Sequence, residues 1–510
     1  MTPLLLALLL SQQIQFQPVP NAIDFKLENF PSPAKFLPET MAGGLALFDY
    51  NNDGLIDIFF ASGADLTTGK KAPNRLFRND GNFHFTDVTE AAGLKGAGFA
   101  FGAAAADFDG DGFVDLFIPA FPNSQLFRNL GNGKFEDITS QAGIQSSKWP
   151  IAAAWLDYDH DGKLDLFIVN YLDWSPANNP WCGDRSKDLR VYCLPNRFNP
   201  LSNTLYRNLG NGRFEDVSKQ TSLAAHPGKG MSAAVGAQGI FVTNDTLPNA
   251  LFRYNKQGVF EEVALAAGVS LPDSGRPISA MGVDMRDLNN DAQDDIVITA
   301  LAREAFSYFQ SGAKGQFTDV TNPTRLAALT ARYSGWGIAI ADLDNDGWKD
   351  IVTCNSHVND QIEATSADRY KLPNTIFRNV NGKTFTSQAL GDPRAHRGCA
   401  LADLDNDGRL DLVVTVLGEM PEIWRNTSPP ANWLDIEAPL GTTVSIGNQT
   451  NSATSSVGYS SSSLTPIHFG LGTQKVVSLQ IAYPNNGRIE IRDAVQSNQR
   501  FKLTPPAQSK

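Results

Sequence analysis

A nine-residue segment rich in aspartate recurs along this chain and limits the possible folds more than any other feature. Its fullest form is Asp403–Asp411, DLDNDGRLD, with carboxylates at positions 1, 3, 5 and 9 and glycine at position 6. Four carboxylates in so short a loop repel one another unless a cation binds between them. Ca²⁺ accepts about six to eight oxygen ligands at flexible geometry, and glycine permits the sharp turn that directs side chains inward. The segment is therefore predicted to bind Ca²⁺, with position 7 contributing its backbone carbonyl oxygen.

Five further segments repeat this pattern: Asp49–Asp57, Asp107–Asp115, Asp157–Asp165, Asp287–Asp295 and Asp342–Asp350. Counted from first aspartate to first aspartate through to Asp403, the intervals are 58, 50, 130, 55 and 61 residues. A recurring period of this size indicates a repeat architecture, and the 130-residue interval corresponds to two periods with one loop lost. A single acidic loop can simply be solvated, but six loops with the same ligand positions favour about six calcium sites.

The predicted ligands occupy positions 1, 3, 5, 7 and 9 of each loop. They are Asp49, Asn51, Asp53, Leu55 and Asp57; Asp107, Asp109, Asp111, Phe113 and Asp115; Asp157, Asp159, Asp161, Lys163 and Asp165; Asp287, Asn289, Asp291, Gln293 and Asp295; Asp342, Asp344, Asp346, Trp348 and Asp350; and Asp403, Asp405, Asp407, Arg409 and Asp411.

The residues around the loops predict β-hairpins. An EF-hand is excluded, because position 12 never carries the glutamate that this motif requires. The runs GLALF before Asp49 and IDIFFA after Leu55 are short, apolar and typical of strands. We expect each loop to be a hairpin tip. This arrangement resembles the calcium loop of the FG-GAP repeat in the β-propellers of integrin α chains.

A second hairpin follows each calcium hairpin. Asn and Gly between two strand-like runs supply the positive φ angles that tight hairpin turns need. The clearest copies are Leu76–Val88, Leu126–Ile138 and Leu205–Val217. Two hairpins provide four strands, which make one propeller blade. At Gly230–Asp245 both strands of a calcium hairpin remain while the loop is reduced to Gly236–Gly239. The chain is thus predicted to be all-β, with a seven-bladed propeller at residues 14–428.

The two ends of the propeller are predicted to meet. The seventh blade has a third strand near Ile423–Arg425, but the chain then reaches Pro429–Pro430 without supplying a fourth. The N-terminal segment Ile14–Pro18 resembles an outer strand that lacks a hairpin of its own. We expect it to complete the seventh blade, because an unclosed ring would leave an open sheet edge.

An insertion at residues 170–200 carries two of the four cysteines. Cys182 and Cys193 lie in one irregular, Pro-rich and aromatic stretch, which predicts a local disulfide. Long ordered insertions are often functional, and the alternative is a lid without a binding role. Cys354 and Cys399 lie on adjacent blades, each four residues from its loop. In a shared register their side chains point to the same side rather than at each other. We therefore expect free, buried thiols, although a register shift of one residue would reverse this.

Charge and the N-terminus bear on partners and compartment. The formal net charge is −12, and 22 of the 54 acidic residues occupy positions 1, 3, 5 and 9 of the loops, so six Ca²⁺ ions would bring the total to about zero. No basic patch is visible, which argues against a nucleic-acid partner. Residues 1–13 contain the apolar run Leu4–Leu10, too short to span a membrane but typical of a secretory signal peptide. No later segment is apolar enough to be transmembrane. We expect a secreted, extracellular, periplasmic or cell-surface protein.

From Asn432 the composition changes. Thr442–Ser463 is rich in Ser, Thr and Asn, and the segment PIHFGLG at Pro466–Gly472 is followed by alternating apolar and polar runs. Residues 431–507 are predicted to form a small, separate β domain.

These motifs together resemble the cartilage acidic protein group, whose members combine FG-GAP repeats with a C-terminal ASPIC/UnbV domain. The resemblance rests on Leu37–Gly54, Asn170–Cys193, Gly228–Met231, Val242–Arg253, Ser279–Asp284, Asn355–Val358 and Gly458–Gly472. It implies a calcium-binding, extracytoplasmic propeller and no particular reaction. The lost fourth loop and a short Gly441–Gly447 segment depart from the family pattern.

Three functions remain in competition. The first is a monomeric, non-enzymatic module that binds or adheres to an extracellular protein or glycan. The second is a calcium-dependent polysaccharide lyase or hydrolase, for which Arg276, His357 and His396 are weak candidates. Turn or cap roles are favoured for both histidines, and no phosphate-binding loop, zinc spacing or nucleophile elbow is present. The third is a structural protein of a cell envelope.

Overall fold

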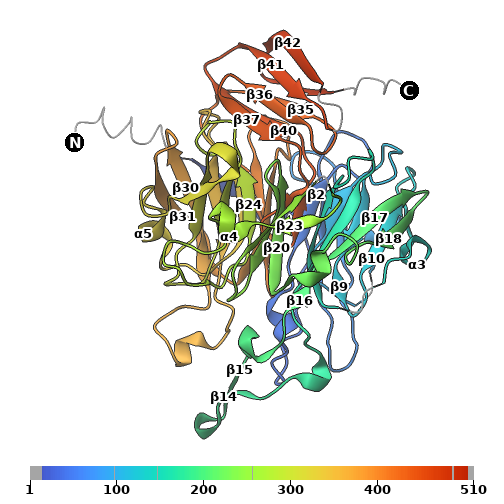
Figure 1. Cartoon of the computed structure of the whole chain (residues 1–510), viewed down its shortest axis with the longest axis vertical. Helices are drawn as coiled ribbons and strands as arrows, with labels where there is room; N and C mark the ends of the chain where they lie inside the picture. The colour runs from blue at the N-terminus through green and yellow to red at the C-terminus, as the bar shows by residue number, and fades with distance from the viewer. Residues whose placement is uncertain (1–13, 97, 146–147, 256, 485–487, 504–510) are drawn as a thin grey trace.

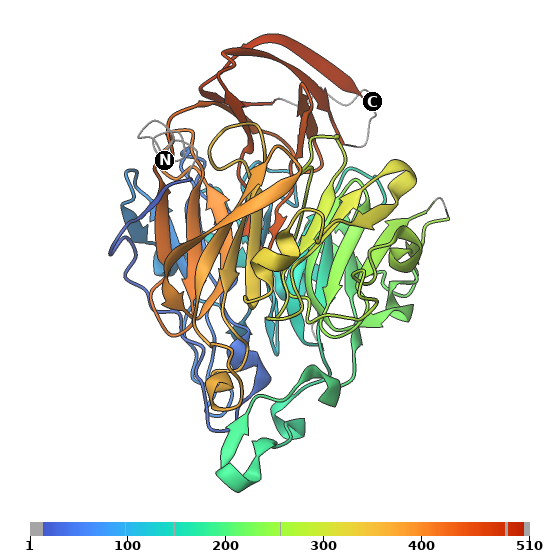
Figure 2. The ribbon, with the colours of Figure 1, turned by 90° about the vertical axis from the view of Figure 1, so that its left-hand side faces the viewer.

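The chain folds into a ring of β-sheets with a smaller β domain at one end (Figures 1 and 2). The computed structural model describes residues 14–96, 98–145, 148–255, 257–484 and 488–503. Strands account for 44% of the residues and helices for 8%, so the predicted all-β class is confirmed. The predicted signal peptide at residues 1–13 lies outside the described residues. Within them, no helix is long and apolar enough to cross a membrane.

Within the described residues, seven sheets each contribute four hydrogen-bonded neighbouring strands to the ring. We call these sets of four strands blades 1 to 7 in chain order. Blade 1 is β2 (Leu45–Phe48), β3 (Asp57–Phe60), β4 (Arg75–Asn79) and β5 (Phe85–Asp87). Blade 2 is β7 (Ala104–Ala106), β8 (Asp115–Ile118), β10 (Gln125–Asn129) and β11 (Phe135–Asp137). Blade 3 is β12 (Pro150–Leu156), β13 (Asp165–Asn170), β17 (Thr204–Gly210) and β18 (Arg213–Asp216). Blade 4 is β20 (Gly230–Gly236), β21 (Gly239–Asn244), β22 (Ala250–Tyr254) and β23 (Phe260–Glu262).

The remaining blades follow the same order. Blade 5 is β24 (Val283–Arg286), β25 (Asp295–Ile298), β26 (Ser307–Ser311) and β27 (Phe317–Asp319). Blade 6 is β28 (Gly335–Ala341), β29 (Asp350–Asn355), β30 (Leu372–Val380) and β31 (Thr384–Arg394). Blade 7 is β32 (His396–Ala402), β33 (Asp411–Val416), β34 (Glu422–Asn426) and the N-terminal β1 (Phe16–Pro18), which pairs antiparallel with β34.

Short elements connect the blades. They are α2 (Thr89–Ala92), α3 (Thr139–Ala142), α4 (Ala264–Ala267), α5 (Leu326–Thr330), the two-residue strands β6 (Phe99–Ala100), β9 (Ala120–Phe121), β16 (Leu201–Ser202) and β19 (Pro227–Gly228), and the 3₁₀ turns η1 (Leu37–Thr40), η5 (Leu223–Ala225), η6 (Ala313–Gly315) and η7 (Ile362–Ala364).

The innermost strands form a closed ring. β2, β7, β12, β20, β24, β28 and β32 contact one another in this order, and β32 contacts β2. Blades converge toward the axis, so small side chains suit these strands, as in the fully buried Ala104–Ala106. Apolar clusters fill the space between neighbouring blades. In blade 4, β20 and β21 join directly at the Gly236–Gly239 pair, without an acidic loop.

The C-terminal region has its own core but is not separate, contrary to the expectation from composition. Its first sheet consists of β35 (Asn432–Glu437), β40 (Ile467–Gly472) and β43 (Gln499–Lys502), and its second of β36 (Thr443–Ile446), β37 (Gln449–Ser452), β41 (Val476–Ala482) and β42 (Ile489–Gln496). A hairpin of β38 (Ser456–Val457) and β39 (Ser461–Ser463) leaves these sheets and enters the ring, where β39 pairs in parallel with β2.

We call Ser456–Ser463 the axial plug, because it contacts inner strands of all seven blades. The Ser461 and Ser462 hydroxyls accept hydrogen bonds from Leu45 N of blade 1 and Ala105 N of blade 2. The Ser463 hydroxyl donates to Leu401 O of blade 7. The plug backbone and Ser460 reach blades 3, 4 and 5 through Ile151 O, Ser232 Oγ and Val283 N. Tyr459 packs edge-on against Trp336 of blade 6, at 4.9 Å between ring centroids. The central channel is thus filled by the C-terminal region.

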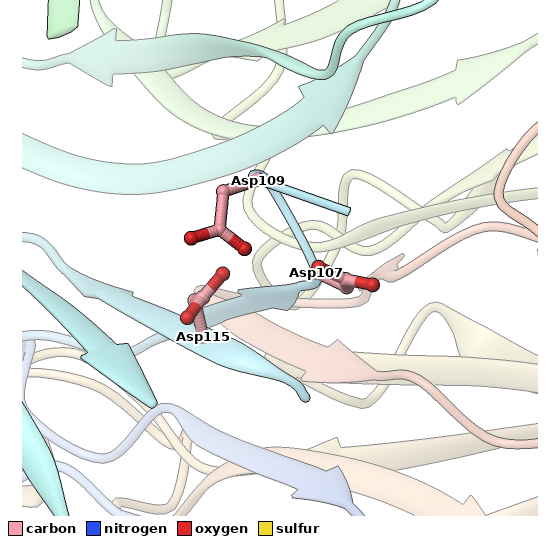
Figure 3. A group of neighbouring side chains, drawn as sticks. All are labelled: Asp107, Asp109 and Asp115. Atoms are coloured by element: carbon pink, nitrogen blue, oxygen red, sulfur yellow. The ribbon is translucent and has the colours of Figure 1, made fainter. Parts of the chain in front are cut away.

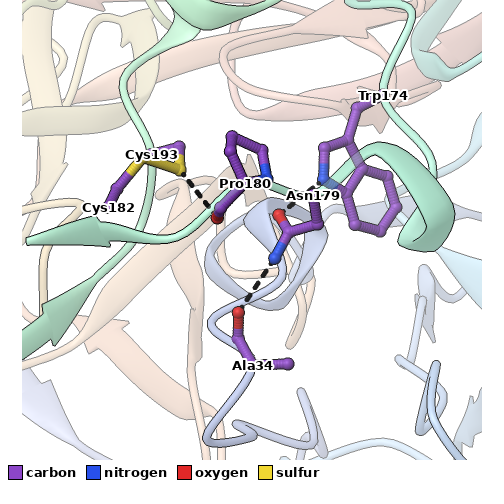
Figure 4. Close-up of a disulfide and its surroundings, with 6 residues drawn as sticks. All are labelled: Ala34, Trp174, Asn179, Pro180, Cys182 and Cys193. Atoms are coloured by element: carbon purple, nitrogen blue, oxygen red, sulfur yellow. Dashed lines mark hydrogen bonds between the residues drawn. A yellow bond between two sulfur atoms is a disulfide. The ribbon is translucent and has the colours of Figure 1, made fainter.

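The insertion lies at the end of the ring opposite the C-terminal region (Figure 1). It contains η2 (Pro176–Asn178), β14 (Cys182–Asp184), η3 (Arg185–Lys187), β15 (Leu189–Val191) and η4 (Pro195–Arg197). A disulfide joins Cys182 to Cys193, as predicted (Figure 4). Asn179 fixes the insertion to the ring, because its Nδ2 donates to Ala34 O at 2.9 Å while its Oδ1 accepts from Trp174 Nε1.

Candidate metal centres

The six acidic loops lie at the tips of the inner hairpins, between the first and second strands of blades 1, 2, 3, 5, 6 and 7. We number each loop by its blade. The C-terminal region contacts three of them, loops 1, 6 and 7. The His468 ring lies 2.7 Å from Asn345 Oδ1 of loop 6, and Trp433 packs against Gly408 of loop 7.

Each loop is wound around its first and last carboxylates. In loop 2, Asp107 accepts hydrogen bonds from the backbone N–H groups of Asp111 and Gly112 at 3.1 and 2.9 Å. Asp115 Oδ2 accepts from Phe108 N at 3.0 Å. Positions 4 and 6 have positive φ in all six loops, and even Ala292 at position 6 of loop 5 adopts φ +67°. This winding turns the side chains of positions 1, 3 and 9 toward one another in loops 2, 3, 6 and 7.

Four loops bring three carboxylates together, with one oxygen of each within 4.8 Å of the others. These are the carboxylates at positions 1, 3 and 9 of loops 2, 3, 6 and 7: Asp107, Asp109 and Asp115; Asp157, Asp159 and Asp165; Asp342, Asp344 and Asp350; and Asp403, Asp405 and Asp411. Figure 3 shows Asp109 and Asp115 facing each other beside Asp107. Loops 1 and 5 carry asparagine at position 3, and the amide oxygen replaces the third carboxylate.

Burial makes these charges costly. The last aspartate of each loop is fully buried, and burial raises the pKa of Asp57 and of Asp115 to about 8. It also raises the pKa of Asp165 and of Asp295 to about 7, although backbone N–H donors oppose the effect. A buried carboxylate needs a counter-charge to stay ionised. A bound cation would provide that counter-charge.

Two unsatisfied oxygens show that the residues fit a hard cation. Asp344 Oδ1 and Asp405 Oδ1 are buried and have no hydrogen-bond partner within the described residues. Both belong to the carboxylate clusters of loops 6 and 7, at position 3. Buried polar atoms are rarely left without a partner, and an all-oxygen donor set of this type suits Ca²⁺. The predicted ligands at positions 1, 3 and 9 thus converge in loops 2, 3, 6 and 7, while the ligands at position 5, the sites of loops 1 and 5 and the number of ions stay predictions.

A set of asparagines links neighbouring loops, and the sequence interpretation missed it. These bridging asparagines lie at or near the end of the third strand of five blades: Asn79, Asn129, Asn208, Asn379 and Asn426. Each donates from Nδ2 to position 8 of its own loop and to the position 2 carbonyl of the preceding loop. In blade 6, Asn379 contacts Lys349 O and Leu288 O, both at 2.9 Å.

The exceptions to this rule fall where one loop is missing. Blade 4, which has lost its loop, carries Tyr254 at the equivalent position, and Tyr254 packs against Tyr158 of blade 3. Blade 5, which follows the missing loop, carries Ser311. This pattern within one sequence was the signal that could have identified the bridging role.

The candidate catalytic residues do not converge within the described residues. His396 is fully buried, and its Nδ1 lies 3.0 Å from Leu372 O. His357 Nδ1 accepts from Asn359 N at 2.9 Å, a turn role as favoured above. Arg276 is exposed in the segment before blade 5. Cys354 and Cys399 are free and buried as expected. Their thiols nevertheless interact, and burial together with Cys399 raises the pKa of Cys354, so the expected divergence of these side chains is wrong.

Comparisons with known proteins agree with this architecture. Residues 49–118, 120–168, 287–353 and 363–414 match the family described as FG-GAP-like repeat. Residues 436–510 match the family described as ASPIC and UnbV. This chain is an FG-GAP-repeat protein with a C-terminal ASPIC and UnbV domain. The unmatched stretch between 168 and 287 contains the insertion and blade 4, the two departures from the regular repeat.

Cartilage acidic protein 1 of Mus musculus is 26% identical over 301 residues, which cover 53% of this chain and 44% of the relative. The Homo sapiens protein of the same name is 26% identical over 302 residues, covering 53% and 43%. The matched region therefore spans less than half the length of these curated relatives.

Two solved structures are also similar in shape. An Agrocybe aegerita lectin, described as recognising non-reducing terminal N-acetylglucosamine, covers 74% of this chain and 87% of its own, with 14% identity and a TM-score of 0.40. YCF48 from Cyanidioschyzon merolae covers 77% and 97%, with 10% identity and a TM-score of 0.43.

Proposed function

We propose that this protein is an extracellular binding module whose propeller is stabilised by Ca²⁺ in six loops, and that it recognises a protein or a glycan. The observation that carries the proposal is the cluster of three carboxylates in loops 2, 3, 6 and 7, together with the unsatisfied Oδ1 atoms of Asp344 and Asp405. The role assigned to the cation is structural, because each ligand set lies within a hairpin tip.

The contacts of the C-terminal region favour the opposite end of the ring as the recognition surface. Loops 6 and 7 are covered by His468 and Trp433, and Arg500 Nη1 donates to Gly54 O of loop 1 at 3.0 Å. The axial plug fills the channel. The insertion instead projects away from the ring (Figure 1).

The insertion combines rigidity with exposed contact groups. Its disulfide and the Asn179–Ala34 hydrogen bond hold its base. Near its tip Arg185 stacks over the Trp181 ring at 4.4 Å, and Leu194 is 65% exposed. Aromatic and arginine side chains are enriched in protein-binding surfaces, and aromatic rings also stack on sugars. The disulfide and the extracellular type of relative support export.

The metal part of the proposal is tested by elemental analysis and thermal unfolding. Calcium-loaded protein should retain about six ions per chain, and excess chelator should lower Tm markedly, because a ligand of the folded state stabilises it by mass action. Unchanged unfolding in chelator, or protein without bound metal, would refute the calcium assignment.

The binding part is tested separately with arrays of glycans and extracellular proteins, with and without chelator. We expect calcium-dependent binding that Trp181→Ala and Arg185→Ala reduce, while Tm stays unchanged. Turnover of any glycan would instead favour the enzymatic alternative, for which the described residues show no converging catalytic groups.

A further inference from the structure

Each of the four loops with aspartate at position 3 is contacted by an arginine from the third strand of its own blade. These arginines precede the bridging asparagines: Arg128, Arg207, Arg378 and Arg425. In blade 6, Arg378 Nε lies 2.8 Å from Asp344 Oδ2, and its Nη2 lies 2.7 Å from Asp346 Oδ2. The arginines of blades 2, 3 and 7 lie 2.7, 2.8 and 2.8 Å from Oδ2 of Asp109, Asp159 and Asp405.

The contact given for each arginine with position 3 is to Oδ2. Oδ1 is the atom left without a partner in Asp344 and Asp405. A guanidinium holds a carboxylate in a fixed plane. The arginine therefore fixes the orientation in which Oδ1 faces the carboxylates of positions 1 and 9.

The two loops with asparagine at position 3 lack this contact. Blade 5 carries Gln310 where the arginine would be. Blade 1 has Arg78, but its Nε pairs with Asp80 at 2.7 Å rather than with position 3. In blade 4, which has no loop, Arg253 donates to Gln238 O. Across the seven blades, the arginine contact is thus present wherever position 3 is aspartate and absent elsewhere.

Asparagine reproduces the geometry that aspartate and arginine create together. Asn51 Nδ2 donates to Asp53 Oδ2 at 2.8 Å, and Asn289 Nδ2 donates to Asp291 Oδ2 at 2.9 Å, so the amide takes over the arginine's contact with position 5. Asn51 Oδ1 accepts from Asp53 N at 3.3 Å, as Asp109 Oδ1 does from Asp111 N. When only the side chains at positions 1, 3, 5 and 9 and the contacting third-strand arginine are counted, both loop types carry a formal charge of −3, from three aspartates or from four aspartates and one arginine.

We propose that the third-strand arginine is a positioning residue for the metal loop. Together with aspartate at position 3, it does what a single asparagine does in loops 1 and 5. The pair fixes Oδ1 of position 3 toward the cation and gives the ligand positions the same formal charge as a single asparagine does. This inference rests on the proposed calcium function and deepens it. It assigns Arg128, Arg207, Arg378 and Arg425 to setting the cation affinity of their loops.

Loop 6 offers a direct test, because Trp348 occupies its position 7 and sensitises Tb³⁺ bound in the same loop. The full-length chain is titrated with Tb³⁺, and the calcium-displaceable luminescence that Trp348→Phe abolishes is assigned to loop 6. Asp344→Asn removes the carboxylate that Arg378 Nε contacts, while Asp346 remains, and changes the summed charge of the ligand positions and Arg378 from −3 to −2. We expect affinity to fall by about tenfold or more, as for other groups that orient metal ligands.

The deciding variant is Asp344→Asn with Arg378→Gln, which copies the Asn289 and Gln310 combination of blade 5. We expect its Tb³⁺ affinity to return to within about threefold of the natural protein. Arg253→Gln, which removes an arginine of the loopless blade 4, serves as the matched control and should change nothing. A double variant as weak as Asp344→Asn, or weaker, would overturn the inference. Absence of bound calcium in the natural protein would instead defeat the proposed function.

Discussion

The bridging asparagines make a quantitative prediction, which we develop for Asn379→Ala. The side chain is 1% exposed, donates to Leu288 O and Lys349 O at 2.9 Å, and accepts from Gly382 N at 2.8 Å. Alanine removes three hydrogen bonds and leaves two buried carbonyl groups and one partly buried N–H group without this partner. At about 1 kcal/mol each, the free energy of unfolding should fall by about 3 kcal/mol.

This loss converts into a small but measurable shift in Tm. An unfolding entropy of about 2.1 cal/mol/K per residue gives roughly 1 kcal/mol/K for a chain of this length, so Tm should fall by about 3 °C. Differential scanning calorimetry in excess calcium measures the shift while the loops remain loaded.

Ser311→Ala is the matched control for this variant. Ser311 occupies the same strand position in blade 5, but its Oγ has no hydrogen-bond partner within the described residues, because no loop precedes it. We expect a shift of less than about 0.5 °C. Equal shifts for the two variants, or an unchanged Tm for Asn379→Ala, would show that the link between blades does not stabilise the ring.

Three further outcomes are expected. In chelator, Tm should fall as pH rises from about 4 to about 8. Burial raises the pKa of Asp57 and of Asp115 to about 8, above the usual value of about 3.9. These groups therefore favour folding only while they are protonated. With saturating calcium this decline should disappear, and pH-resolved calorimetry distinguishes the two cases. Tyr459→Ala removes a fully buried ring and its hydrogen bond to Met41 O, so the whole chain, in one transition, should lose about 3–5 kcal/mol of stability. Asp405→Ala should remove about one ion per chain in elemental analysis; retention of the full number would contradict the assignment of loop 7.

Local pattern was sufficient to predict the repeating parts of the fold. Asp-rich loops between strand-like runs identified the inner hairpins, and Cys182 and Cys193 identified the disulfide. The bridging role of Asn379 was harder to see, because Asn is also common in turns and one motif supports both interpretations. The interaction between Cys354 and Cys399 depended on the register of two blades, which no local pattern determines.

The axial plug lay beyond sequence reasoning for a physical reason. A segment rich in serine is ordinarily predicted to be solvated, because hydroxyls hydrogen-bond to water. The axis of a propeller is an unusual interior, lined by the free edges of the innermost strands, whose N–H and C=O groups need partners. Serine can both donate and accept: Ser462 accepts from Ala105 N, while Ser463 donates to Leu401 O. Its small side chain also fits beside backbone that approaches the axis closely. At Gly102, just before β7, an added Cβ would lie 1.7 Å from Ser460 O. The polar composition that suggested a surface segment is therefore the composition that satisfies the strand edges at the centre of the ring, and the C-terminal region completes the propeller instead of following it.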